Sequence, residues 1–322
     1  MKPTRRAVIA GAVASLAVPR RAQAAWPERP ITLVHGFGPG GNADVLARLL
    51  SDRLPARLGQ SVVVEARPGA GGTTAAAQVS RAVPDGYTLL LVVGGHTVYP
   101  AIYKALLFDA LNGFTFVSML AEYPFIVATY PGHPVKTPAD LIAAARARSE
   151  PMTYGTAGIG TTQHLAMEFF TIRSGIRLQH IPYRGSGQGT TDLLAKRIDF
   201  MIEAPSSLLP QIQVENLRAI GVTSARRFFA LPDVPTLAEG GVAGYDVTSW
   251  SGLGGPPKLP APLVERLNAE VRAVLAEPAV AETIHKIGNE IAPTTPEGFR
   301  QRVASDIAKW SEVAKMAKLQ QI

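Results

Sequence analysis

The sequence of 322 residues contains no cysteine. Without cysteine there is no disulfide framework, no thiolate nucleophile and no cysteine-ligated metal, so stability has to come from a packed core. Histidine is scarce as well, and the six histidines form no H-x-x-x-H pair of the kind that binds zinc. We therefore expect no metal site. A hydrophobic content of 47% is enough for a core, and the length indicates two lobes.

Most of the chain has nearly equal numbers of basic and acidic residues. Residues 1–24 hold five of the 32 Lys and Arg residues and no acid, so 27 basic and 25 acidic residues remain beyond them, a net charge of +2. A chain so close to neutral lacks the basic surface that nucleic acid or an anionic membrane requires. We expect neither as a partner.

Residues 1–24 have the pattern of an export signal. Lys2, Arg5 and Arg6 form a basic start, residues 7–18 are apolar, and AQA at 22–24 is a small-x-small cleavage site. The apolar run is too short to span a bilayer. The pattern predicts a twin-arginine-like signal peptide cleaved near Ala24 and a periplasmic location, with general secretion as the alternative export route.

Strand and helix patterns alternate along the remaining chain. Strands are predicted at residues 31–34, 62–65, 87–93, 125–129, 152–154, 179–182, 200–202 and 245–253. Helices are predicted at residues 43–58, 73–83, 138–148, 162–174, 190–196, 262–276 and 296–319. This order predicts an α/β fold of two lobes with mostly parallel sheets, and a cleft between the lobes at the carboxyl ends of the strands.

The first glycine-rich turn, in ITLVHGFGPGGNAD at residues 31–44, has three interpretations. His35-Gly36 after a strand is typical of an esterase oxyanion turn, but no serine stands in the G-x-S-x-G elbow that such an enzyme needs. Gly36, Gly38 and Gly41 fit the dinucleotide fingerprint G-x-G-x-x-G, and Glu65 follows where a ribose-binding acid belongs. That match keeps a periplasmic NAD(P)-dependent oxidoreductase as the alternative function.

The third interpretation explains all the glycine turns together. Similar turns precede helices at residues 69–72, 155–160 and 183–189. Free backbone N–H groups and the positive end of the helix dipole attract an anion to such a place, and glycine lets the backbone come close to it. Turns that face each other across a cleft would hold both ends of a short diacid.

Several motifs in a fixed order resemble the Bug/TctC family, the periplasmic solute-binding receptors of tripartite tricarboxylate transporters. The resemblance runs from Trp26 to the C-terminus. Its motifs are FGPGG at 37–41 with Asp44, PGAGG at 68–72, PDGYTLL at 84–90, residues 154–165, PYRG at 182–185, LPDVPT at 231–236, EGG at 239–241 and WSGL at 250–253.

The resemblance implies a two-lobed receptor of the periplasmic binding protein type (a type II-like Venus flytrap), without catalysis or cofactor. It implies one lobe from residues 25–122 and 248–322, a second lobe from 123–247, and a monomer that delivers its ligand to a membrane permease. The ligand would be a small carboxylate such as a di- or tricarboxylate, an aromatic acid or an acidic amino acid. By position, the ligand-binding residues would be Phe37, Pro39, Gly40, Gly41, Asp44, Gly94, His96, Gly158, Gly160, Thr161, Thr162, Tyr183, Arg184, Gly185 and Glu203.

Departures from the family pattern leave the roles of two side chains undecided. Glu203 puts a negative charge near the expected anion site, so it either faces an amino group or another donor of the ligand or turns away as a loop acid. Arg184 either pairs with a second ligand carboxylate or with Glu203 or solvent. His35 and Gly94-Gly95 also stand where the family usually has other residues.

Overall fold

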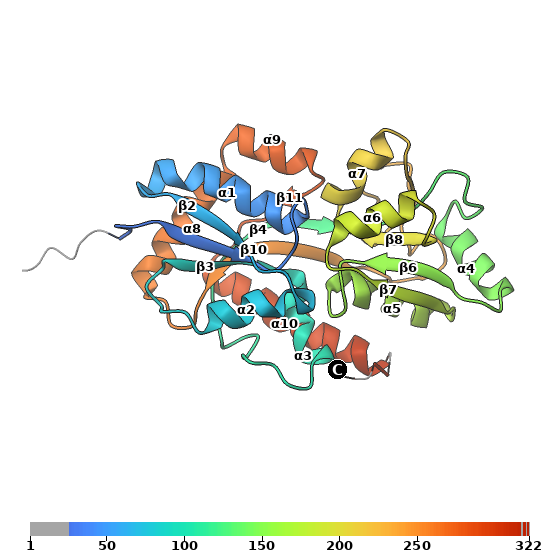
Figure 1. Cartoon of the computed structure of the whole chain (residues 1–322), viewed down its shortest axis with the longest axis horizontal. Coiled ribbons are helices and arrows are strands. Elements are labelled where there is room, and N and C mark those ends of the chain that lie inside the picture. Colours follow the sequence, from blue (N-terminus) through green and yellow to red (C-terminus); the bar gives the residue numbers. More distant parts are fainter. Residues whose placement is uncertain (1–25, 317, 320, 322) are drawn as a thin grey trace, which may run out of the picture.

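The computed structural model describes residues 26–316, 318–319 and 321, so the predicted signal peptide lies outside the described residues. The described chain forms two lobes side by side, each built around its own β-sheet (Figure 1). Within this part of the chain, no helix is long and apolar enough to cross a membrane.

The first lobe contains a six-stranded sheet in the order β11-β4-β10-β3-β1-β2. Its strands are β1 (Ile31–His35), β2 (Val62–Ala66), β3 (Thr88–Val93), β4 (Thr115–Pro124), β10 (Thr248–Gly255) and β11 (Glu290–Ile291). β1 runs parallel to β2 and β3, whereas β10 is antiparallel to both β3 and β4. The sheet is therefore mixed, and not mostly parallel as the sequence pattern predicts.

Helices cover both faces of this sheet. They are α1 (Asn42–Leu58), α2 (Thr73–Ser80), α3 (Tyr99–Ile102), α8 (Ala261–Leu275), α9 (Pro278–Lys286) and α10 (Pro296–Met316), with short 3-10 turns η1 (Ala70–Gly72) and η2 (Gly94–Thr97). Successive strand residues point to opposite faces. Thus Leu89 and Leu91 pack in the cluster with α1 and α8, whereas Leu90 and Val92 pack in the cluster with α2 and α10. This two-sided burial explains the unbroken apolar run in β3.

The second lobe contains a five-stranded sheet in the order β7-β6-β8-β5-β9. Its elements are β5 (Ile126–Thr129), α4 (Pro138–Ala147), β6 (Met152–Thr156), α5 (Thr162–Ser174), β7 (Leu178–Pro182), α6 (Ser186–Leu194), β8 (Phe200–Glu203), α7 (Pro205–Gln213) and β9 (Arg218–Val222). β6 is parallel to β7 and β8, and β5 is antiparallel to β8 and β9. Phe200 and Ile202 pack with α4 and α5, and Met201 packs with α6 and α7.

The chain crosses between the lobes twice. It leaves the first sheet at the end of β4 and enters the second at β5, and it returns between β9 and β10. Thr223 on the returning segment bonds to the outgoing one: the Phe125 N–H donates to Thr223 Oγ1 at 2.8 Å, and the Thr223 N–H donates to Phe125 O at 3.0 Å. Helix α10 adds a further link, because Phe299 packs in the first lobe and Trp310 in the second.

One predicted helix begins earlier than its pattern indicates. Residues 190–196 were expected to be helical, but α6 starts at Ser186 and includes glycine residues that the pattern assigns to a turn. A Cβ on Gly189 would lie 2.6 Å from Met201 Cε, so this helix can pack closely on β8 only because it has glycine there. The last predicted strand is displaced in the opposite direction, since β10 spans Thr248–Gly255 and not residues 245–253.

Candidate functional site

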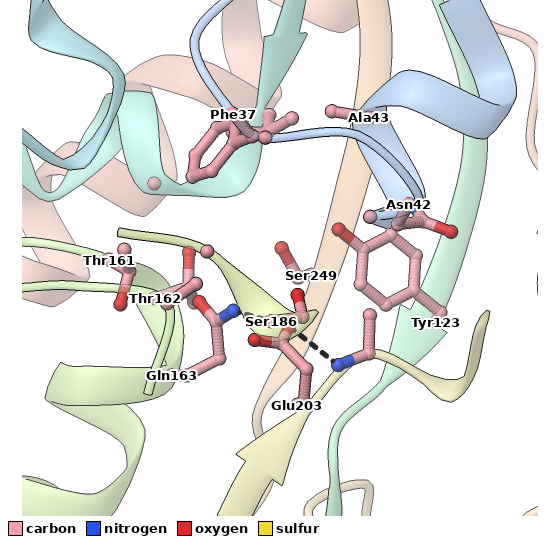
Figure 2. Close-up of a pocket in the computed structure, with 17 residues that line it drawn as sticks. Phe37, Asn42, Ala43, Tyr123, Thr161, Thr162, Gln163, Ser186, Glu203 and Ser249 are labelled. Carbon is pink, nitrogen blue, oxygen red and sulfur yellow. Dashed lines mark hydrogen bonds between the residues drawn. The ribbon is translucent and has the colours of Figure 1, made fainter. Parts of the chain in front are cut away.

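A small pocket of about 40 Å³ lies between the lobes, at the carboxyl ends of β1, β3, β6 and β8. Figure 2 shows its walls, which come from both lobes. The first lobe contributes Phe37, Gly38, Gly41, Asn42, Ala43, Val93, Gly95, Tyr123 and Ser249. The second lobe contributes Ala157, Thr161, Thr162, Gln163, Gly185, Ser186, Glu203 and Ala204.

Four helices begin at this pocket: α1 at Asn42, α5 at Thr162, α6 at Ser186 and α7 at Pro205. No side chain caps the first turn of α1 or α6, so their first backbone N–H groups have no intrahelical or side-chain acceptor. Each helix start carries a positive partial charge that stabilises an anion by about 0.3–1 kcal/mol when exposed and up to about 2 kcal/mol when partly buried. The pocket therefore presents positive dipoles from both lobes to one small space.

Glu203 is the one acidic or basic side chain among the described residues that line the pocket. Its Oε1 accepts hydrogen bonds from Gln163 Nε2 at 2.7 Å and from the Ala204 N–H at 2.9 Å (Figure 2). Its Oε2 is buried and has no hydrogen-bond partner among the described residues. Burial raises the pKa of Glu203 above its ordinary value, and the Ala204 N–H, the Gln163 amide and the nearby Ser186 hydroxyl oppose that rise. Glu203 therefore faces the pocket and is not a solvent-exposed loop acid.

The two lobes are in contact around the pocket. A Cβ on Gly71 would lie 2.6 Å from Ile159 O of the other lobe, and a Cβ on Gly185 would lie 3.7 Å from Gly38 N. Gly71 also has φ of 64°, a conformation that favours glycine. This is a closed arrangement, and a ligand would have to enter when the lobes part.

A larger groove of about 630 Å³ adjoins the pocket and shares Phe37, Gly38 and Ala157 with it. Its other lining residues are Gly36, Pro68, Gly69, Ala70, Gly71, Tyr103, Gly158, Ile159, Pro182, Tyr183 and Arg184. Arg184 therefore lies on the groove side and not among the residues around Glu203. The Tyr183 hydroxyl donates to Asp192 Oδ2 at 3.0 Å, which holds this loop to α6.

The structure brings six of the predicted site residues together in the pocket: Phe37, Gly41, Thr161, Thr162, Gly185 and Glu203. Three others line the adjoining groove: Gly158, Tyr183 and Arg184. The remaining six lie outside both linings: Pro39, Gly40, Asp44, Gly94, His96 and Gly160.

Asp44 points back into its own loop. Its Oδ2 accepts from the Gly40 N–H and from Arg48 Nε, both at 3.0 Å, and its Oδ1 lies 3.3 Å from Nε2 of the fully buried His35. Burial opposes ionisation of Asp44, but the hydrogen bonds from Arg48 and Gly40 hold its pKa below the usual value. Burial lowers the pKa of His35. Asp44 therefore shapes the loop before α1 and does not face the pocket.

His96 also turns away from the pocket. Its ring packs edge-on against Tyr99 and Phe114, and its Nε2 donates to Ala110 O at 2.7 Å. Burial lowers its pKa to about 4, so the ring is neutral near pH 7. Its neighbour Gly95 lines the pocket in its place.

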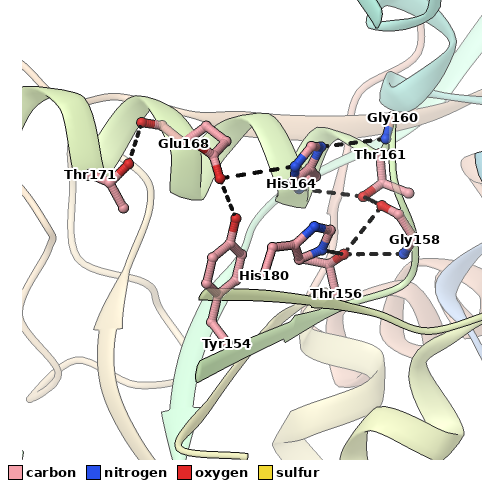
Figure 3. Close-up of polar contacts among 9 residues, drawn as sticks. All are labelled: Tyr154, Thr156, Gly158, Gly160, Thr161, His164, Glu168, Thr171 and His180. Carbon is pink, nitrogen blue, oxygen red and sulfur yellow. Dashed lines mark hydrogen bonds and ion pairs between the residues drawn. The ribbon is translucent and has the colours of Figure 1, made fainter. Parts of the chain in front are cut away.

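A polar network within the second lobe holds the loop that carries Thr161 (Figure 3). Thr156 Oγ1 lies 2.7 Å from His180 Nε2 and accepts from the Gly158 N–H at 3.1 Å. The Thr161 hydroxyl donates to Gly158 O at 2.8 Å, and it also accepts from the His164 N–H. The network fixes the start of α5 against the pocket.

Among the residues that the structure describes, no group of three or more His, Cys, Asp or Glu could hold a metal.

Several pocket residues were missed by sequence reasoning. Asn42 and Ser186 are the first residues of α1 and α6, so the rule that helix starts bind anions could have found them. Tyr123 and Ser249 could not be found in this way, because they reach the pocket from the paired ends of the antiparallel strands β4 and β10.

The chain is similar in sequence to a family of transporter receptors. The family described as TctC, "Tripartite tricarboxylate transporter family receptor", matches residues 46–319. A "UPF0065 protein in tcbD-tcbE intergenic region" of Pseudomonas sp. (strain P51) is 36% identical over 313 residues, which are 96% of this chain and 93% of that protein. "Protein BugT" of Bordetella pertussis is 33% identical over 324 residues, 98% of each chain.

Solved structures agree with these sequence relatives. "R. palustris Rpa4515 with adipate" has a TM-score of 0.88 and 35% identity, covering 92% of this chain and all of that one (100%). "Structure of periplasmic binding protein BugD" gives 0.87 and 32%, with coverage of 92% and 100%. "MatC (Rpa3494) from Rhodopseudomonas palustris with bound malate" gives 0.85 and 28%, with coverage of 89% and 99%.

Proposed function

Because the chain belongs to the tripartite tricarboxylate transporter receptor family, we propose that it binds a small carboxylate in the pocket between its lobes. This membership confirms the family resemblance seen in the sequence, the two-lobed fold and the receptor function. The observation that carries the proposed site is the meeting of four helix starts at one pocket between the lobes.

One ligand carboxylate would lie against the free N–H groups at the starts of α1 and α6, with the start of α5 between them. The proposed contacts are Phe37, Gly41, Thr161, Thr162, Gly185 and Glu203, together with Asn42, Gln163 and Ser186. Two of the similar structures were solved with adipate and with malate, which are dicarboxylates. A longer ligand would extend into the adjoining groove, where Arg184 offers a charge for a second carboxylate.

The wider role follows from the family. The mature chain would act in the periplasm after cleavage near Ala24, as a monomer and without catalysis, and would pass its ligand to a membrane permease of the tripartite tricarboxylate type. Residues 25–122 and 248–322 would form one moving lobe and residues 123–247 the other, with the boundary in the last two residues of β4, Tyr123 and Pro124, which pair within the first sheet. The two crossing segments and α10 support this division, since they would bend when the lobes part.

A thermal-shift screen of residues 25–322 tests the function. The panel contains mono-, di- and tricarboxylates, aromatic acids, amino acids and NAD(P). A ligand at a hundred times its dissociation constant stabilises the folded state by about 2.7 kcal/mol. At about 2–4 °C per kcal/mol for domains of 150–250 residues, this is a rise of several degrees. A shift with one carboxylate class supports the proposal, whereas a shift with NAD(P) alone contradicts it.

A further inference from the structure

Glu203 gives the pocket a charge that a simple anion receptor does not need. The side chain is 2% exposed and stands at the end of β8, directly before the start of α7. Gln163 Nε2 and the Ala204 N–H both bond to Oε1, so the carboxylate is held in one orientation. Its second oxygen, Oε2, is left buried without a hydrogen-bond partner among the described residues.

When Glu203 is ionised, the charges around the pocket do not balance without a cation. Among the described residues that line it, Glu203 is the one acid and none is Lys, Arg or His. The positive helix ends attract the carboxylate of a ligand, but a purely anionic ligand would place a second negative charge beside the buried carboxylate of Glu203. Like charges in a desolvated site repel strongly, so a buried acid either keeps its proton, as the raised pKa of Glu203 allows, or is ionised beside a charged partner.

Other polar atoms at the pocket wall favour the same ligand group. Thr162 Oγ1 and Glu203 Oε2 are both buried and have no hydrogen-bond partner in the described chain. Ser249 Oγ and the Tyr123 side chain complete this side of the pocket (Figure 2). A hydroxyl group of the ligand could donate to Oε2, but it would leave the negative charge uncompensated. An ammonium group does both, because it carries three donors and a positive charge.

We propose that Glu203 selects ligands that carry a protonated amine close to their carboxylate, so that the pocket takes an amino acid or a similar zwitterion. The ligand carboxylate lies at the starts of α1, α5 and α6, and its ammonium group donates to Glu203 Oε2. This inference rests on the proposed function, since it names the chemical class that the same pocket prefers.

Matched pairs of ligands test the inference by isothermal titration at pH 7. Each pair is an amino acid and the acid that lacks only its amine: L-glutamate and glutarate, L-aspartate and succinate, L-alanine and propionate, L-phenylalanine and 3-phenylpropionate. We expect the amino acid of at least one pair to bind about 30-fold or more tightly than its partner, the effect typical of a buried charged hydrogen bond.

Glu203→Gln removes the charge while keeping the size of the side chain. We expect the ratio of affinities, amino acid to partner acid, to fall to about one or below in this variant. Glu265→Gln is the matched control, since Glu265 is exposed on α8 and the variant loses the same charge without touching the pocket. It should keep the wild-type ratio. Glu203→Asp, which withdraws the carboxylate by one methylene, should give an intermediate ratio.

The outcomes separate this inference from the proposed function. If the acids without an amine bind as tightly as the amino acids, or if Glu203→Gln keeps the wild-type ratio, Glu203 does not select for an amine and the inference is overturned while carboxylate binding stands. If no member of any pair binds to the wild-type chain but another carboxylate of the thermal-shift panel does, the inference is overturned while carboxylate binding stands. If no carboxylate binds at all, the receptor function fails and the inference fails with it.

Discussion

Thr223 and Val247 bond to each other in both directions at the junction of the lobes. The Val247 N–H donates to Thr223 O at 2.8 Å, and the Thr223 hydroxyl donates to Val247 O at 2.7 Å. The same hydroxyl oxygen accepts from the Phe125 N–H on the other crossing segment. The buried Thr223 side chain therefore joins the two crossing segments, which would have to bend when the lobes open.

Replacing Thr223 with valine should destabilise the fold. The substitution keeps the shape but leaves the Phe125 N–H without its side-chain acceptor and Val247 O without its donor, and each buried unsatisfied group costs about 1–3 kcal/mol. The free energy of unfolding, measured with urea, should fall by about 1–3 kcal/mol for each of the two groups. Thr283→Val is the control, because Thr283 is exposed on α9 and bonds only within its own helix. Equal effects of the two variants would show that Thr223 has no special role.

The stability of the unliganded chain should depend on pH through Glu203. Burial raises the pKa of Glu203 above 4.5, so over a range above that value the folded state holds a proton that the unfolded state has released. The contribution of Glu203 to the free energy of unfolding therefore decreases as pH rises through this range. Tyr123 is the titratable neighbour that couples to Glu203, and burial raises its pKa too, so it stays neutral here.

Urea denaturation of the wild-type chain and Glu203→Gln between pH 4 and 8 measures this effect. Other titrating groups are common to both proteins and cancel in the difference. We expect the stability of Glu203→Gln relative to wild type to increase with pH. A difference that is constant across the range would mean that the pKa of Glu203 is not raised.

Asp44→Asn should loosen the loop before α1. Asp44 accepts charge-assisted hydrogen bonds from Arg48 and the Gly40 N–H, and hydrogen bonds to charged groups contribute about 1.5–3 kcal/mol each. Because Arg48 is mostly exposed, solvent screening reduces its share. We expect a loss of about 1–3 kcal/mol in the free energy of unfolding and weaker ligand binding. Asp52→Asn, on the exposed face of the same helix, should change neither. An unchanged stability of Asp44→Asn would contradict a role in holding the loop.

The sequence predicts the parts of the site that local rules govern. Glycine turns before helices identify Gly41, Thr161 and Gly185, because a helix start needs free N–H groups wherever it lies in the fold. Periodicity finds β1 and β3 in the same way, since their residues are buried on both faces of the sheet.

Contacts between distant segments are beyond these rules. Tyr123 and Ser249 meet at the pocket only because β4 and β10 pair antiparallel, with Ser249 opposite Tyr123. Local sequence rules also do not predict the direction in which a side chain points. Gly95 and His96 both follow the end of β3, but Gly95 lines the pocket whereas His96 packs among Tyr99, Phe108 and Phe114. The extra first turn of α6 depends on the close approach of Gly189 to Met201.

The most direct test of the site is isothermal titration of the carboxylate found in the screen into Gly185→Leu and Gly187→Leu. A side chain at Gly185 would project toward Gly38 of the opposite lobe, whereas a Cβ at Gly187 meets no atom within 4 Å. We predict that Gly185→Leu loses binding by about 100-fold or more, since the lobes cannot close, while Gly187→Leu binds as the wild type does. Wild-type affinity in both variants would place the ligand somewhere other than between the starts of α1 and α6.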